Sequence, residues 1–294
     1  MNQSFLAGCI LLTGCGRVGF AESGDSSVPD ASARCGPWSD PVHQTSLGSQ
    51  DRFDWGAEIN ADATEIAFDS DRGGSQDLYV ASRAARTAPW SGIAKIDALS
   101  TAGFDADQTR TADDLEVFFT SDRVGARFCL YTERRATAAA AWTSAGIMRL
   151  DALCAADTVG GAWISDDGLR LYYTSALDQT SMGFLRVSVR STRDDDFAAG
   201  VLVPGLASGS MKGFPTLSAD ELEIWWQQGA PSRLFTAARR SITDAFGVPE
   251  AVMPSTNLHD DGDASISGDG QTFEFSSTRL GGDWEYFEMT RECP

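Results

Sequence analysis

The sequence predicts an all-β protein, a five-bladed β-propeller in which an N-terminal strand closes the last blade. Three observations support this fold. A repeat of about fifty residues occurs five times, each repeat alternates apolar and polar residues with the period of a β-strand, and the last repeat is one strand short. The chain has 294 residues, which is long enough for one large domain or two ordinary ones.

Each repeat contains a short motif of Ser, Thr or Asn, then any residue, then Asp. The five copies are Asn60-Ala61-Asp62, Thr111-Ala112-Asp113, Ser165-Asp166-Asp167, Ser218-Ala219-Asp220 and Ser267-Gly268-Asp269. Side chains of these types bond nearby backbone groups, and the Asp-Gly pairs of the third and fifth copies favour a hairpin. The motif is therefore expected to form a turn between two strands.

An apolar pair follows each motif, four and six positions after its Asp, so that both side chains share one face of a strand. The pairs are Ile66/Phe68, Val117/Phe119, Leu171/Tyr173, Ile224/Trp226 and Phe273/Phe275. The next strand ends at Arg83, Arg134, Arg190, Arg239 or Arg291, and in the first four repeats an aromatic residue then opens a further strand. Four antiparallel strands per repeat, arranged around an axis, predict a propeller blade.

The two chain ends are expected to meet in the fifth blade. The fifth repeat stops soon after Arg291, whereas the segment around Trp38 resembles the strand that opens at Trp90. Cys35 and Cys293 fall in the same short connection, so a disulfide between them is favoured over buried thiols.

For Cys129 and Cys154 a disulfide and two free buried thiols remain equal alternatives. A zinc site is disfavoured, because no two cysteines lie close together in the sequence and no His stands beside a Cys.

The repeats resemble the PD40 family of WD40-like repeats, which is also found in the propeller of the translocation protein TolB. The similarity is best in Asn60–Tyr79, with its Ser70-Asp71-Arg72 turn, and in Asp261–Gly282. The third and fourth repeats depart from the pattern, since Ser175-Ala176-Leu177 and Gln227-Gln228-Gly229 replace the Ser-x-Arg turn. The resemblance covers residues 36–294 and implies the fold, while such repeats serve many functions.

Residues 1–14 are predicted to be a lipoprotein signal peptide, although they lack the usual Lys or Arg. Leu12-Thr13-Gly14-Cys15 resembles a bacterial lipobox, which implies lipid attachment at Cys15. Residues 15–34 are predicted to be a flexible tether and residues 35–294 the propeller domain. Gly16 favours the outer membrane, where the protein would face the periplasm or the cell surface and contact the membrane through its lipid alone.

Composition disfavours a nucleic-acid ligand, because the net charge is −19. The sequence has two His and no nucleophile elbow, P-loop or HExxH motif, so we predict no catalytic residue and no protein-bound transition metal. The expected oligomeric state is a monomer.

Candidate ligand residues stand near the start of each repeat, where the innermost strand is expected. They are Asp54, Asp105, Asp107, Asp157, Lys212, Asp261 and Asp263. If they surround the mouth of the propeller channel, their oxygens could bind a cation such as calcium or a sugar. In the favoured alternative, each Asp bonds backbone amides of its own blade.

Two functions follow from these observations. The favoured one is a non-catalytic binding or scaffold module on the bacterial envelope, with a protein or glycan ligand. The alternative is a carbohydrate-active enzyme resembling glycoside hydrolases, which uses a pair of the channel-mouth aspartates. Trp55, Trp163, Trp225 and Trp226 either stack on sugars or pack within the blades.

Overall fold

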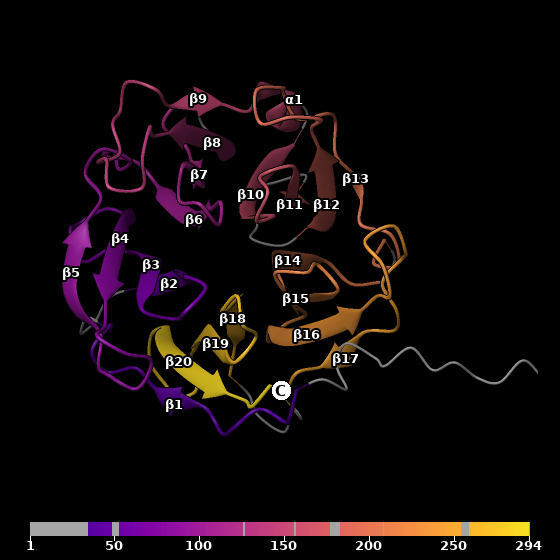
Figure 1. Cartoon of the computed structure of the whole chain (residues 1–294). Helices are drawn as coiled ribbons and strands as arrows, with labels where there is room; N and C mark the ends of the chain where they lie inside the picture. The colour runs from indigo at the N-terminus through magenta and orange to yellow at the C-terminus, as the bar shows by residue number, and fades with distance from the viewer. Residues whose placement is uncertain are drawn as a thin grey trace, which may run out of the picture.

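A computed structural model describes residues 35–48, 53–125, 127–155, 157–176, 183–207, 209–253 and 259–293, and every structural statement below concerns these ranges. They form five antiparallel four-stranded sheets around a central axis (Figure 1). The predicted five-bladed propeller is confirmed. The predicted signal peptide, tether and lipidated Cys15 lie outside the described residues. Within these ranges no helix is long and apolar enough to cross a bilayer.

The strands of blades 1 to 4 follow one another outward from the axis in chain order. Blade 1 consists of β2 (Asp54–Ile59), β3 (Glu65–Ser70), β4 (Asp77–Ser82) and β5 (Ser91–Lys95). Blade 2 consists of β6 (Asp105–Arg110), β7 (Glu116–Ser121), β8 (Cys129–Arg134) and β9 (Met148–Arg149). Blade 3 consists of β10 (Thr158–Ile164), β11 (Arg170–Ala176), β12 (Phe184–Val189) and β13 (Val201–Leu202). Blade 4 consists of β14 (Lys212–Leu217), β15 (Glu223–Gln228), β16 (Arg233–Ala238) and β17 (Glu250–Ala251).

Blade 5 joins the two ends of the chain. It consists of β18 (Asp261–Ile266), β19 (Thr272–Ser277) and β20 (Glu285–Thr290), and its outer strand is β1 (Val42–His43). In Figure 1 the indigo β1 lies beside the yellow β20. The Cys35–Cys293 disulfide joins the two ends of the domain, as predicted.

A second disulfide links Cys129, the first residue of β8, to Cys154 in the short helix α1 (Asp151–Cys154). Both cysteines are buried, and they belong to the hydrophobic cluster between blades 2 and 3. The structure therefore decides between the two alternatives that the sequence left open. The disulfide fixes the helix that leads from blade 2 to blade 3 against its own blade.

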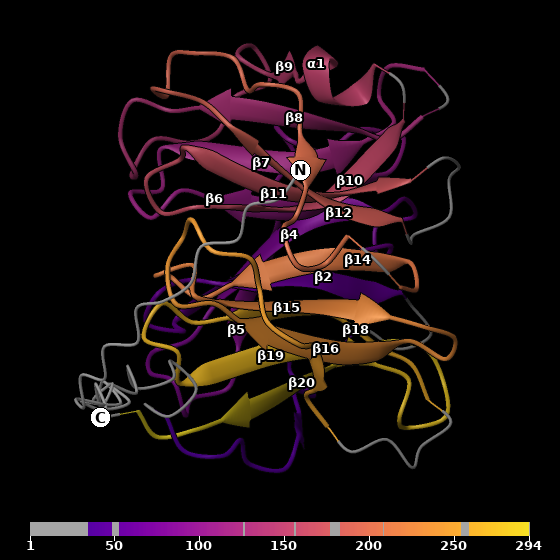
Figure 2. The ribbon, with the colours of Figure 1, turned by 90° about the vertical axis from the view of Figure 1, so that its right-hand side faces the viewer.

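The hydrophobic core is divided among the seams between neighbouring blades, which are seen from the side in Figure 2. Each predicted apolar pair is buried, with at most 2% of either side chain exposed. At the seam between blades 1 and 5, Phe68 packs edge-on against Tyr286 with ring centroids 5.7 Å apart. A single blade could not bury these faces, so the blades depend on their neighbours for stability.

The turn motif caps the loop between the first two strands of each blade. In blade 3, Ser165 Oγ accepts hydrogen bonds from the backbone N–H groups of Leu169 and Arg170 and donates one to Asp167 at 2.6 Å. In each blade, the residue two positions before the second strand adopts a left-handed φ. These residues are Ala63, Asp114, Gly168, Glu221 and Gly270.

An arginine beyond the third strand secures that left-handed residue. Its Nε donates a hydrogen bond of 2.6–2.8 Å to the carbonyl oxygen, and its guanidinium stacks on the aromatic residue that opens the outer segment of the blade. The pairs are Arg83 with Trp90, Arg135 with Trp142, Arg190 with Phe197, Arg239 with Phe246, and Arg291 with Trp38.

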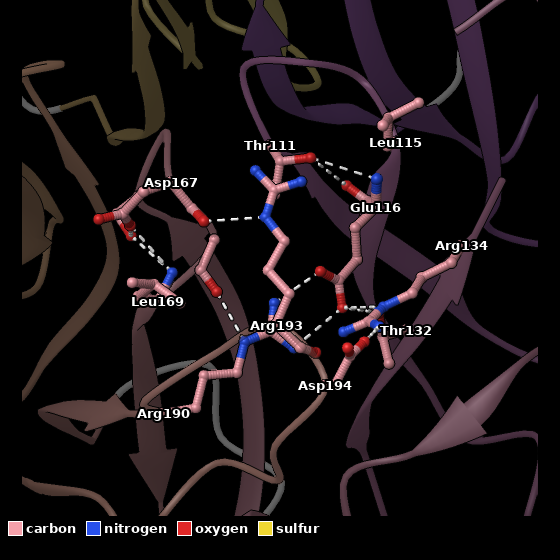
Figure 3. A network of polar contacts seen from close by, with 12 residues as sticks. Thr111, Leu115, Glu116, Thr132, Arg134, Asp167, Leu169, Arg190, Arg193 and Asp194 are labelled. Carbon is pink, nitrogen blue, oxygen red and sulfur yellow. Dashed lines mark hydrogen bonds and ion pairs between the residues drawn. The ribbon is translucent and has the colours of Figure 1, made fainter. Parts of the chain in front are cut away.

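In the second repeat the third strand ends at Arg134, as predicted, and the next residue, Arg135, makes these contacts. Arg134 instead joins the seam between blades 2 and 3, shown in Figure 3. There Glu116, almost fully buried, pairs with Arg190 at 2.6 Å and with Arg134 at 3.1 Å. Two arginines on one buried carboxylate compensate for its loss of hydration and hold the two blades in register.

Candidate functional site

The innermost strands β2, β6, β10, β14 and β18 surround the propeller axis (Figure 1), and the register of each is interrupted by a β-bulge. In all five strands, one residue within the bulge has a left-handed φ. These residues are Gly56, Asp107, Gly161, Phe214 and Asp263. A bulge changes the direction of the side chain at that point. All five of these residues line a cavity on the axis.

The bulges are held by hydrogen bonds between neighbouring blades. The backbone N–H of Asp107 donates to Asp69 Oδ1 of blade 1 at 3.1 Å, and that of Gly161 donates to Thr120 Oγ1 of blade 2 at 3.1 Å. The N–H of Phe214 donates to Thr174 of blade 3 at 2.9 Å. The side chains at the axis are thus positioned by the seams between blades.

Asp54, Asp105 and Asp261 lie at the start of their innermost strands and are at most 3% exposed. Each carboxylate pairs with the arginine of the Ser-x-Arg turn in its own blade. The distances between the paired nitrogen and oxygen are 2.9 Å for Arg72 and Asp54, 2.7 Å for Arg123 and Asp105, and 2.8 Å for Arg279 and Asp261. None of the three aspartates belongs to the described lining of the axial cavity.

The equivalent positions of blades 3 and 4 differ, since they carry Val159 and Lys212. Burial lowers the pKa of Lys212, whose Nζ donates to the carbonyl of Ser210 at 2.9 Å. Asp157 accepts a hydrogen bond from Ser175 at 2.8 Å. Of the seven residues predicted at the channel mouth, Asp107 and Asp263 line the axial cavity.

The axial cavity has a volume of about 40 Å³. Its carboxyl groups belong to Glu58, Asp107 and Asp263, and no Lys, Arg or His occurs among the described residues that line it. Burial raises the pKa of Glu58 to about 7 and that of Asp107 to about 6. Burial and the charge of Asp107 also raise the pKa of Asp263 and of the neighbouring Asp69. The described lining of the axial cavity therefore supplies no positive charge of its own, and Arg110, which lowers the pKa of Glu58, lies outside that lining.

A second, larger cavity of about 250 Å³ shares Asp107, Gly161 and Phe214 with the axial cavity. We call it the mouth pocket. Its remaining lining residues are Trp55, Phe104, Thr120, Phe128, Thr158, Val159, Gly160 and Thr174. Four aromatic side chains and one carboxyl group make this an apolar site with a single ionisable contact, a composition that is typical of small-molecule pockets.

Sequence reasoning named Asp107 as a candidate at the channel mouth, and it named Trp55 as a residue that either stacks on sugars or packs within a blade; both line the mouth pocket. It missed Phe104 and Phe128, which precede β6 and β8 and pack with ring centroids 4.7 Å apart. It also missed Phe214, whose direction depends on the bulge. The position of the bulge residue in the repeat was the available signal, because Asp107 and Phe214 occupy the same place in their blades.

The tryptophans proposed to stack on sugars are separated by the structure. Trp225 and Trp226 are buried between blades, and Trp163 lines the axial cavity. Trp55 lines the mouth pocket. In the described part of the chain no three His, Cys, Asp or Glu side chains are arranged to hold a metal ion. Calcium binding stays a prediction.

Comparison with known proteins shows similarity of fold to several solved structures. No family model and no curated protein sequence matches the chain. An α-L-arabinofuranosidase from Lactobacillus brevis is 8% identical with a TM-score of 0.56, and covers 85% of this chain and 94% of its own. The catalytic domain of the GH62 α-L-arabinofuranosidase from Coprinopsis cinerea is 13% identical with a TM-score of 0.54, and covers 88% and 96%.

TolB from Acinetobacter baumannii is 16% identical with a TM-score of 0.49; the alignment covers 84% of this chain and 56% of TolB. The chain therefore spans little more than half the length of that protein. At these identities the similarity is one of fold. The chain belongs to the class of five-bladed β-propellers, and its two disulfides are consistent with a location outside the cytoplasm.

Proposed function

We propose that this protein is a non-catalytic binding module of the bacterial envelope and that its ligand occupies the mouth pocket. The observation that carries the proposal is the contrast between two sets of residues. Asp54, Asp105 and Asp261 are engaged by arginines of their own blades, whereas the mouth pocket is lined mainly by aromatic and small side chains. An apolar pocket with few polar groups suits binding, and acid–base hydrolysis of a glycoside requires two suitably placed carboxyls.

The anchoring of the module is part of the same proposal. We infer that residues 1–14 direct export, that Cys15 carries the lipid, and that a PD40-type propeller is displayed as a monomer from the outer membrane. The lipobox resemblance of Leu12–Cys15 and the presence of two disulfides support this. The ligand is then a glycan, an envelope protein segment or a small molecule that reaches the periplasm or the cell surface.

The test uses the full chain with Cys15→Ser, which removes the predicted lipidation. It is screened against glycans, envelope peptides, small metabolites and calcium by a binding assay, and each mixture is analysed for turnover. We expect saturable binding without turnover, and loss of binding in Trp55→Leu. Trp284→Leu is the matched control, because Trp284 packs 6.1 Å from Trp55 but does not line the pocket.

Two results would contradict the proposal. Hydrolysis of a glycan that disappears in Asp107→Asn would support the carbohydrate-active enzyme instead. Binding that is equally strong in the parent chain and in Trp55→Leu would place the ligand elsewhere on the propeller.

A further inference from the structure

The mouth pocket combines two features that together favour one chemical class of ligand. Its rings come from separate elements of the fold: Trp55 from β2, Phe104 from the segment before β6, Phe128 from the segment before β8, and Phe214 from β14. Aromatic faces carry negative electrostatic potential and attract cations. A pocket lined by four such rings from three blades contacts its occupant from several directions.

The charge of the mouth pocket also favours a cationic ligand. Asp107 is the one ionisable residue among the described lining residues of the mouth pocket. It is placed by the bulge of β6, and its Oδ2 accepts a hydrogen bond from the N–H of Gly161 at 3.1 Å. No basic side chain belongs to the described lining of either cavity, so a cationic ligand meets no like charge there.

A second carboxyl group lies next to the mouth pocket. Asp263 is 5% exposed and occupies the same bulge position in blade 5. Its Oδ1 has no hydrogen-bond partner among the described residues, and it lines the axial cavity that adjoins the pocket. The net charge of −19 attracts cations to the protein as a whole.

We propose that the mouth pocket binds a small quaternary ammonium compound, with its charged group among the aromatic rings and next to Asp107. This rests on the proposed function, since it names the ligand class of the same pocket. The volume of about 250 Å³ is small for a drug-sized ligand and suits one compact charged group. A bulky alkylammonium ion is weakly hydrated, so rings and one carboxylate replace its water at little cost.

The test compares choline with its neutral carbon isostere, 3,3-dimethylbutan-1-ol, by calorimetry on the full chain with Cys15→Ser. The two probes have the same shape and differ in charge. We expect choline to bind at least about fivefold more tightly than the isostere, because cation–π contacts contribute on that scale. The ratio of the two affinities is the readout, since it cancels losses of apolar contact that affect both probes.

Two variants and their matched controls locate the effect. Trp55→Leu and Asp107→Asn are each expected to bring the ratio close to one, and the Asn side chain keeps an oxygen for the Gly161 N–H. Trp163→Leu and Asp263→Asn change the same residue types in the axial cavity without touching the mouth pocket, so they should retain most of the ratio. Circular dichroism and melting temperature confirm that each variant is folded.

Equal affinity for choline and the isostere would overturn the inference while leaving the binding-module proposal intact. Undetectable binding of both probes would also overturn it, and the glycan and peptide screen would then judge the proposed function separately. A preference for choline that persists in both Trp55→Leu and Asp107→Asn would place the cation outside the mouth pocket and would likewise refute the assignment.

Discussion

The Cys35–Cys293 disulfide closes almost the whole domain, and its effect on stability can be compared with that of a second disulfide in the same chain. The closing disulfide joins residues 258 apart in sequence, and Cys129–Cys154 joins residues 25 apart. In the chain-entropy account a crosslink destabilises the unfolded chain more when the loop is longer, which gives about 5.5 kcal/mol for the first and about 3.5 kcal/mol for the second.

The effect of removing the closing disulfide on the native state depends on the other contacts of the N-terminal segment. Without the disulfide, the N-terminal segment is still held by the pairing of Val42 with Glu288, by a 2.7 Å hydrogen bond from Gly36 to Glu292, and by Trp38 on the Arg291 guanidinium. The blade should therefore stay closed in the native state after reduction. The disulfide then acts chiefly on the unfolded chain, and its removal lowers the free energy of unfolding without opening the ring.

The measurement needs chains that carry one disulfide each. In a Cys9→Ser, Cys15→Ser background, one protein also carries Cys129→Ala and Cys154→Ala, and the other carries Cys35→Ala and Cys293→Ala. Urea unfolding of each with and without reductant gives the effect of one disulfide, because the cost of the substitutions cancels. We expect the closing disulfide to contribute more, by about 1–2 kcal/mol. An equal or smaller contribution from the closing disulfide would refute the loop-length argument.

Two further predictions concern side chains that the structure singles out. Arg135→Lys should lower the free energy of unfolding by about 1–3 kcal/mol, because it removes a hydrogen bond to the Asp114 carbonyl and the stacking on Trp142, whereas Arg134→Lys at the more exposed pair should cost less than about 1 kcal/mol. Chemical unfolding of both variants checks this, and the reverse order would contradict it. Burial raises the pKa of Glu58 from about 4.5 in the unfolded chain to about 7 in the folded protein. The free energy of unfolding therefore falls as the solution pH rises from about 4.5 to about 7. Glu58→Gln keeps an acceptor for Thr109 and should stabilise the protein by at most about 3 kcal/mol at about pH 8, but little at about pH 5; an effect independent of pH would contradict the assignment.

The arrangement of the blades was predictable because its causes are local and repeat along the chain. The turn motif, the apolar pair and the arginine with its aromatic partner each appear in the sequence at constant spacing, and each makes a contact within one blade or with the next. The sequence analysis identified Arg134 as the end of its strand, and the interval to the aromatic residue distinguishes Arg135 as the arginine that stacks. In blades 1, 3 and 4 the arginine precedes its aromatic partner by the same interval, as from Arg83 to Trp90, and Arg135 satisfies it.

The mouth pocket was less predictable because it depends on departures from regular strand geometry. Alternation places Asp105 and Asp107 on one face of β6, but the bulge separates them: Asp105 pairs with Arg123 inside the blade, and Asp107 reaches the axis. A left-handed φ at Asp107, Phe214 and Asp263 is uncommon for residues other than Gly, so the residue types did not indicate the bulge, although its position is the same in each repeat. The same geometry holds where the Ser-x-Arg turn is missing, in blades 3 and 4.

The difference between positions that carry the same residue in several blades and positions that carry different residues helps to locate a ligand site. Residues that recur in the repeats, such as Asp54 with Arg72, are explained by contacts within their own blade. The axial cavity is lined by one bulge residue from each blade, and an asymmetric ligand is favoured where those residues differ. The bulge position meets this condition, because its five occupants are Gly56, Asp107, Gly161, Phe214 and Asp263. The aromatic lining residues of the mouth pocket come from blades 1, 2 and 4, and Asp263, whose Oδ1 has no hydrogen-bond partner among the described residues, belongs to blade 5. In a propeller built from repeats, the positions at which the copies differ on the axis are therefore the first ones to mutate in a search for its ligand.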